Sequence, residues 1–122
     1  MTAPATATHW QQPMDPTDQV DYLARFDGPA PVLEADETIA SYTVELMPEA
    51  AGAGLMVSQG GGRDPALVDG KAISLWFEVD VAKRESGIFA KGIAAGVVFT
   101  ITTTAVPARR RQRTFFLTVA QL

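Results

Sequence analysis

The sequence contains no cysteine and a single histidine, His9. Without cysteine the chain has no disulfide and no thiolate nucleophile, and the usual structural zinc ligand sets cannot be assembled. A Ser–His–Asp triad would have to use His9, which lies near the N-terminus in a segment interrupted by prolines. We therefore expect a protein that is not an enzyme, with no catalytic residues, no cofactor and no metal.

Basic residues are also scarce, since 10 Lys and Arg face 14 Asp and Glu in 122 residues and give a net charge of −4. This balance argues against a general affinity for nucleic acid or for an anionic membrane surface. No apolar run reaches the roughly 18 residues of a membrane span, and the N-terminus lacks the basic start and apolar core of a secretory signal. The length and composition predict one globular domain, made in the cytoplasm, with neither nucleic acid nor a membrane as a partner.

The clearest pattern in the sequence is the period-2 alternation of β-strands. Apolar residues occupy every second position over residues 20–26 and 40–46, and most regularly over residues 73–81. Successive side chains of a strand point to opposite faces, so each run has one face for a core and one for water. The pattern assigns Ala40 and Val81, among others, to the core face.

Shorter runs complete an all-β pattern. Four further strands are expected, at residues 55–58, 88–89, 97–106 and 114–122. Segments rich in glycine or proline separate them, and no segment of useful length has the 3.6-residue period of a helix. Six or seven short antiparallel strands in a chain of this size predict a single immunoglobulin-like β-sandwich over residues 19–122.

Residues 1–18 hold three of the eight prolines and are expected to form an extended N-terminal arm. The arm carries two large side chains, Trp10 and Met14. Either these side chains pack locally and close the end of the sandwich, or the arm docks on a neighbouring subunit, because an exposed tryptophan needs an apolar partner.

Arg109, Arg110, Arg111 and Arg113 form the one concentrated cluster of charge and account for four of the ten basic residues. The sequence places them in a turn at residues 107–113, at the tip of the last hairpin. Either they are solvated, or they contact an acidic neighbour, because arginine pairs bidentately with carboxylates. No aromatic residue interleaves with them, which disfavours nucleic acid.

Two other polar segments show weaker signals. Glu34, Asp36 and Glu37 lack the spacing of a calcium loop and are expected to be a solvated turn, with weak divalent-cation binding as the alternative. The glycine run at residues 60–62 lacks the order of a phosphate loop and is expected to be flexible. Trp76 lies on the polar side of its strand, where it covers a small cluster or belongs to an interface.

Several short motifs occur in a fixed order along the chain. A D-P-x-D-x-x-D-Y motif leads from the arm into the first strand, and an E-T-I-A segment enters the second. The motif residues are Asp15, Pro16, Asp18, Asp21, Tyr22, then Glu37 to Ala40, the Leu75–Trp76–Phe77 core, and Gly92, Ala95, Gly96, Phe99 and Ile101. A threonine-rich strand, a basic turn and a T-x-x-L-x-V ending follow over residues 102–119. In this order the motifs resemble the phage fiber-tail adaptor family.

The resemblance implies an immunoglobulin-like structural protein of a tailed-phage virion, made in the host cytoplasm. Its expected role is an assembly module that joins neighbouring subunits, with tail, fiber or capsid proteins as partners and a homo-oligomer in the particle. The expected contacts are Trp10 and Met14 on the arm, the arginine cluster, and residues 82–91, which look like an insertion. The glycine-rich segment at residues 50–71 also departs from the family pattern.

Two alternative functions remain open at this stage. A sandwich of this size also suits a capsid cement or decoration protein on the phage head. It suits equally a receptor- or carbohydrate-binding module, in which Trp10 and Trp76 would be the aromatic contacts.

Overall fold

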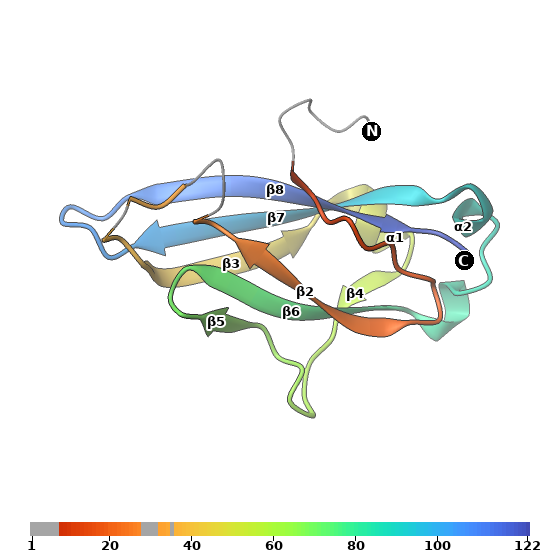
Figure 1. Ribbon diagram of the computed structural model, residues 1–122. Helices are drawn as coiled ribbons and strands as arrows, with labels where there is room; N and C mark the ends of the chain where they lie inside the picture. The colour runs from red at the N-terminus through yellow and green to blue at the C-terminus, as the bar shows by residue number, and fades with distance from the viewer. Residues whose placement is uncertain (1–7, 28–31, 35) are drawn as a thin grey trace.

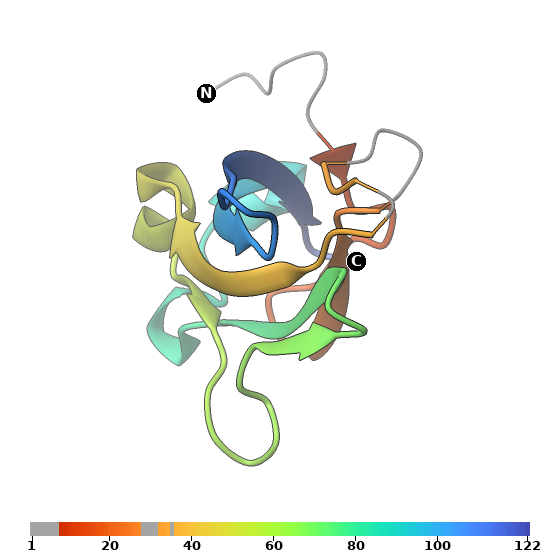
Figure 2. The same ribbon diagram turned by 90° about the vertical axis from the view of Figure 1, so that its left-hand side faces the viewer.

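Two β-sheets pack face to face in the computed structural model, which describes residues 8–27, 32–34 and 36–122 (Figures 1 and 2). The first sheet has the order β1 (Thr8–His9), β8 (Arg110–Val119), β7 (Ile93–Thr103) and β3 (Ile39–Leu46). The second has the order β2 (Gln19–Arg25), β6 (Ala72–Val79) and β4 (Leu55–Val57), and β5 (Ala66–Val68) also pairs with β6. Buried side chains from both sheets share one core, so the predicted all-β sandwich is confirmed.

The strict alternation in β2 and β6 is confirmed. Tyr22 and Ala24 of β2 are buried, and Ile73, Leu75, Phe77 and Val79 of β6 are all inaccessible to solvent or nearly so. The assignment of Val81 to the core was wrong, because its side chain is 73% exposed. The strand ends at Val79, and Asp80 caps a 3-10 turn, η1 (Val81–Lys83), by accepting a hydrogen bond from the N–H of Ala82.

Strand β3 contains one irregularity that changes its pattern. Ile39 is buried and the following Ala40 is exposed, which contradicts the prediction that Ala40 faces the core. The pairing of β3 with β7 shifts by one residue between Ile39 and Ser41, and such a bulge leaves one residue unpaired. Beyond it the alternation resumes, and Tyr42 packs against the core as expected.

Two short helices lie between strands. Helix α1 spans Pro48–Gly52, and helix α2 spans Ile88–Lys91, where a two-residue strand was expected. In α2 the ring of Phe89 is buried, and the carbonyl of Phe89 accepts a hydrogen bond from the N–H of Gln121 at 2.8 Å. The helix ends at Gly92, whose φ of +83° favours glycine. The segment is therefore a helical turn that packs against the chain's own C-terminus.

Strands β4 and β5 pair with the same strand, β6, at different points along it. Val57 lies opposite Phe77 and Ala66 lies opposite Ser74, so only Leu75 and Trp76 of β6 lie between the two pairings. Residues 58–65 form a loop at this point that protrudes from the sandwich (Figure 2). Strand β5 was not predicted, because a three-residue strand next to this loop has too short a pattern to detect.

The longest hairpin joins β7 to β8, with pairs running from Ile93 opposite Val119 to Thr102 opposite Arg110. Its turn comprises residues 104–109 and is closed by a hydrogen bond from the N–H of Thr103 to the carbonyl of Arg109 at 2.8 Å. The predicted turn at residues 107–113 was wrong in its position. The arginines continue the strand because β-branched or aromatic residues, which favour strands, lie opposite them on β7, and their long side chains can remain in solvent.

Candidate functional site

The first half of β8 carries the exposed arginines. Arg110, Arg111 and Arg113, with Gln112 between them, are exposed and pair on one side with β7. On the other side, β1 pairs only with Phe115 and Phe116, and none of the described residues pairs with residues 110–114 there. We call residues 110–113 the basic edge. A strand edge with free backbone groups can pair with another chain.

The side chains of the basic edge point to both faces of the sheet. Arg111 and Arg113 lie on the same face as Phe115, and Arg110 lies on the opposite face, because strand residues alternate. Arg113 donates from Nη1 to the carbonyl of Gln112 at 2.8 Å. Within the described ranges, no ion pair joins these three arginines to a carboxylate. Their charge is therefore available to an acidic partner.

Arg109 has a different environment from the other three arginines. Its Nη1 donates to Oε1 of Glu34 at 2.8 Å, in an ion pair at the surface. This hydrogen bond, and then the charge of Glu37, raise the pKa of Arg109 above its ordinary value. Arg109 therefore pairs within its own chain. Although it belongs to the arginine run in the sequence, it is not part of the basic edge.

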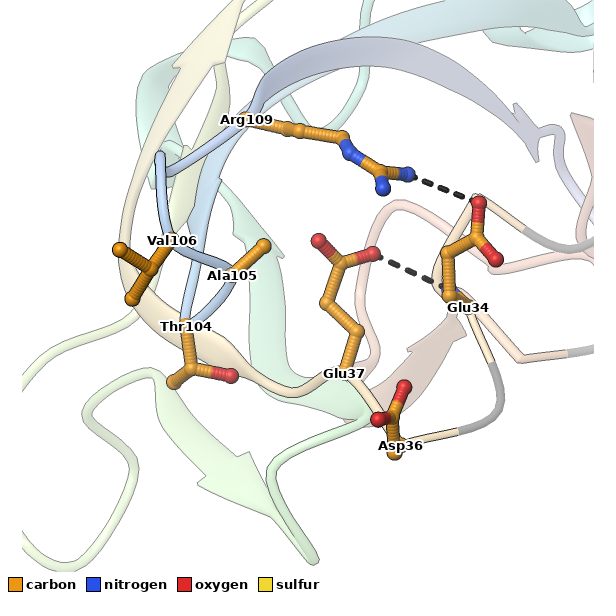
Figure 3. A pocket seen from close by; sticks show the side chains of 7 residues that line it. All are labelled: Glu34, Asp36, Glu37, Thr104, Ala105, Val106 and Arg109. Atoms are coloured by element: carbon orange, nitrogen blue, oxygen red, sulfur yellow. Dashed lines mark hydrogen bonds and ion pairs between the residues drawn. The ribbon is translucent and has the colours of Figure 1, made fainter.

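The Arg109–Glu34 pair lies in a pocket of about 390 Å³ between the hairpin turn and the segment that precedes β3 (Figure 3). The pocket is lined by Glu34, Asp36, Glu37, Thr104, Ala105, Val106 and Arg109. Thr38 and Thr104 hold its two walls together, because the N–H of Thr38 donates to Oγ1 of Thr104 at 3.0 Å and the N–H of Thr104 donates to the carbonyl of Thr38 at 2.9 Å. We call this cavity the hairpin pocket.

Glu37 is the least expected member of the hairpin pocket. Its side chain is only 4% exposed, so the prediction that the whole acidic cluster is solvated was wrong for this residue. The Thr103 hydroxyl, and then the N–H of Glu34, lower the pKa of the Glu37 carboxyl below its ordinary value of 4.5. Oε1 of Glu37 accepts the hydrogen bond from the N–H of Glu34 at 3.0 Å, and the carboxyl is ionised at neutral pH.

Trp10 is half-buried and packs against the core of its own sandwich. Its ring lies 5.1 to 6.3 Å, between centroids, from the rings of Tyr22, Phe77, Phe99 and Phe115. Its Nε1 donates to the carbonyl of Leu23 at 2.9 Å, so the indole links the two sheets. Of the two roles considered for this side chain, the geometry favours local packing.

Met14 also belongs to the core, with 0% of its surface exposed. Its backbone continues the edge of the first sheet, because the N–H of Met14 donates to the carbonyl of Thr118 and the N–H of Ala120 donates to the carbonyl of Met14, both at 2.9 Å. The expected contact between Met14 and a neighbouring subunit does not fit this burial. The described part of the arm lies along β8 of the same chain.

The remaining candidate contacts have mixed positions. Within residues 82–91, Phe89 is buried and Ile88 is exposed. Trp76 is half-buried, and the guanidinium of Arg63, from the loop at residues 58–65, lies over its ring at 5.4 Å from the centroid. Trp76 is therefore already covered on one face by a cation–π contact.

No model of a known protein family matches this sequence, and no curated protein matches it. None of the helices in the described ranges is long and apolar enough to cross a membrane. The described residues also contain no group of three or more His, Cys, Asp or Glu side chains placed to hold a metal ion. The basic edge can interact with a partner through its charge and through strand pairing.

Proposed function

We propose that this chain is a non-enzymatic structural protein of a tailed-phage virion, an immunoglobulin-like assembly module of the fiber-tail adaptor type. The order of the short motifs from Asp15 to Val119 supports the phage assignment. Its partners are other virion proteins, and copies of the chain form a homo-oligomer in the particle.

The strand order supports the immunoglobulin-like part of the proposal. In that fold, strands B and E lie beside D in one sheet, and C, F and G form the other. The second sheet here has β2, β6 and then β4 with β5, and the first has β3, β7 and β8. The short parallel strand β1 beside β8 corresponds to a first strand that crosses between the sheets.

The basic edge is the observation that carries the assembly role. It combines backbone groups that none of the described residues pairs on that side with three exposed arginines, in a chain of net charge −4. An acidic extended segment of a neighbouring subunit could add to the edge through its backbone and pair with Arg111 or Arg113 through its carboxylates. Repeated copies in a symmetric particle would multiply such contacts.

The test replaces Arg110, Arg111 and Arg113 together by serine and measures how much of the protein is incorporated into purified particles. We expect incorporation to be lost while the variant remains folded. In the wild type, incorporation should fall steeply as ionic strength rises, because salt screens exposed charges. Incorporation of the variant at the wild-type level would contradict the proposal.

The matched control removes the same charge elsewhere. Arg25, Lys83 and Lys91 lie outside the basic edge, and replacing all three by serine changes the net charge by the same amount. This control should be incorporated normally. A particle map with the subunit located then separates the adaptor from the capsid decoration protein, since the first lies on the tail and the second on the head.

The carbohydrate-binding alternative has less support. Such a site needs exposed aromatic faces, whereas Trp10 is half-buried against core rings and Arg63 covers one face of Trp76.

A further inference from the structure

The Glu37 carboxylate is buried, and one of its oxygens has no hydrogen-bond partner among the described residues. Within the described ranges no donor meets hydrogen-bond geometry at Oε2, although the residue is only 4% exposed; the Thr103 hydroxyl interacts with the carboxyl and lowers its pKa without satisfying this oxygen. Figure 3 shows the carboxylate pointing into the hairpin pocket, between Arg109 and Ala105. Buried charged oxygens are normally satisfied, because an unpaired one loses its hydration without compensation. This oxygen is therefore positioned to accept a hydrogen bond from a ligand.

The charges around the pocket favour a cation. Glu34, Asp36 and Glu37 contribute three carboxylates, and Arg109 is the one cation among the lining residues. Arg109 pairs with Glu34 and also interacts with the charge of Glu37, so it offsets one of the three negative charges. Arg111 is near enough to influence Glu37, and a negative balance remains even when its charge is included.

The walls of the pocket favour an organic cation over a metal ion. Ala105 and Val106 offer alkyl surface beside the carboxylates. The volume of about 390 Å³ falls in the range of roughly 300–1,000 Å³ typical of sites for small molecules and side chains. Within the described ranges, the carboxylates are not grouped as metal ligands.

We propose that the hairpin pocket binds an alkyl guanidinium or alkyl ammonium group, the group at the end of an arginine or lysine side chain. An N–H of the cation donates to Oε2 of Glu37, and the methylene stem lies against Ala105 and Val106. The hairpin pocket is negatively charged, whereas the basic edge is positively charged. The proposed cation site therefore does not depend on the proposed role of the basic edge.

Binding is tested on the full chain by NMR titration with Nα-acetyl-arginine methylamide and the corresponding lysine compound. Both should give saturable shifts of the backbone amides of Glu34, Thr104, Ala105 and Val106. The citrulline analogue has nearly the same shape as the arginine compound and no charge, so it should give none. This comparison uses only the wild-type protein and does not depend on how any variant folds. Equal binding of the citrulline and arginine compounds, or no saturable shift, would overturn the proposal.

A variant locates the binding atom. Glu37→Gln keeps an oxygen for the N–H of Glu34 and removes the charge, so the affinity for the arginine compound should fall about tenfold or more, as for loss of a hydrogen bond to a charged group. Glu45→Gln, which neutralises an exposed carboxylate on β3, should leave the affinity unchanged. An unchanged affinity in Glu37→Gln would also overturn the proposal.

A third arm distinguishes the sources of the cation. If the natural occupant is a basic side chain of a neighbouring subunit, the isolated blocked amino acids need to bind only weakly, because the rest of the interface supplies the remaining affinity. If the natural ligand is a free amine, putrescine should bind at least a hundredfold more tightly than the blocked lysine compound. Either result supports the cation site and identifies its occupant.

Discussion

The two halves of strand β8 have the same backbone conformation and opposite environments. Residues 115–119 bury Phe115, Phe116, Leu117 and Val119, and the segment from Thr8 to Met14 covers their outer edge. Residues 110–113 are exposed, and no described residue covers their outer edge. One half of a single strand thus contributes to the core, and the other half is available for an interaction.

The covered half also shows how the N-terminal segment acts. Trp10 and Met14 fill space between the sheets, while Asp15 accepts hydrogen bonds from the N–H groups of Thr17 and Leu122, both at 2.9 Å. The segment therefore joins the N-terminal part of the domain to its C-terminus. An extended, proline-rich segment can thus form an edge of the core.

The largest expected effect comes from the covered half. Phe115→Ala should lower the free energy of unfolding by about 3–5 kcal/mol, because it removes a buried ring that contacts Trp10, Phe26 and Phe99. Urea denaturation measures the change. Arg113→Ala, two residues away on the same face, should change the free energy by no more than about 0.5 kcal/mol. Similar effects of the two substitutions would remove the distinction between the halves.

Met14→Ala tests whether the N-terminal segment is part of the domain. The side chain is fully buried, so its truncation should lower the free energy of unfolding by about 2–5 kcal/mol. Urea denaturation again measures it, with Gln11→Ala as the control, since Gln11 is exposed in the same segment. A loss within error of zero would mean that this segment detaches in solution.

Lowering the pH should weaken the hydrogen bonds that the Asp15 and Glu37 carboxylates accept. Hydrogen bonds from the N–H of Leu122 and then from Thr17 lower the pKa of Asp15 below its ordinary value of 3.8, and the pKa of Glu37 is also lowered. A carboxyl whose pKa is lower in the folded state stabilises that state above its unfolded pKa and loses this contribution as pH falls through its folded pKa. The free energy of unfolding should therefore decrease as the pH is lowered from about 5 towards 3.

Variants assign this pH dependence. Asp15→Asn should be less stable than the wild type at pH 7 and should lose less stability between pH 7 and pH 3, as measured by urea midpoints. Glu85→Gln removes an exposed carboxylate and should retain the wild-type pH dependence. If Asp15→Asn has the same slope as the wild type, its hydrogen bonds do not contribute to the acid sensitivity.

The smallest effect on stability is expected at the basic edge. Serine at Arg110, Arg111 and Arg113 should change the free energy of unfolding by no more than about 0.5 kcal/mol per residue, because the side chains are exposed and form no ion pair within the described part of the chain. The same substitutions should have their full effect on incorporation into particles. A stability loss of several kcal/mol would instead assign the arginines a structural role.

The sequence predicted the parts of the fold that depend on local pattern. Strands β2 and β6 follow strict alternation, and their buried faces were identified correctly except at Val81. The bulge at Ala40 depends on the register with β7, and the packing of Trp10 depends on rings from four distant positions. Such long-range geometry has no local signature.

The candidate site shows the same limit. The arginine run was recognised as a concentration of charge but was placed in a turn, and only the cross-strand pairs with β7 place it in a strand. The burial of Glu37 arises where the segment before β3 meets the hairpin turn, through Thr38 and Thr104. Neighbouring acidic residues in the sequence gave no indication that one of them would be enclosed.

The loop at residues 58–65 has a consequence for protein engineering. It begins after Val57, at the end of β4, and ends before Ala66, at the start of β5, and both of these strands pair with β6. Lengthening a surface loop adds only slowly to its closure entropy, about 0.6 kcal/mol for each doubling. A foreign peptide inserted among Gly60, Gly61 and Gly62 should therefore be displayed away from the sandwich without disturbing its register.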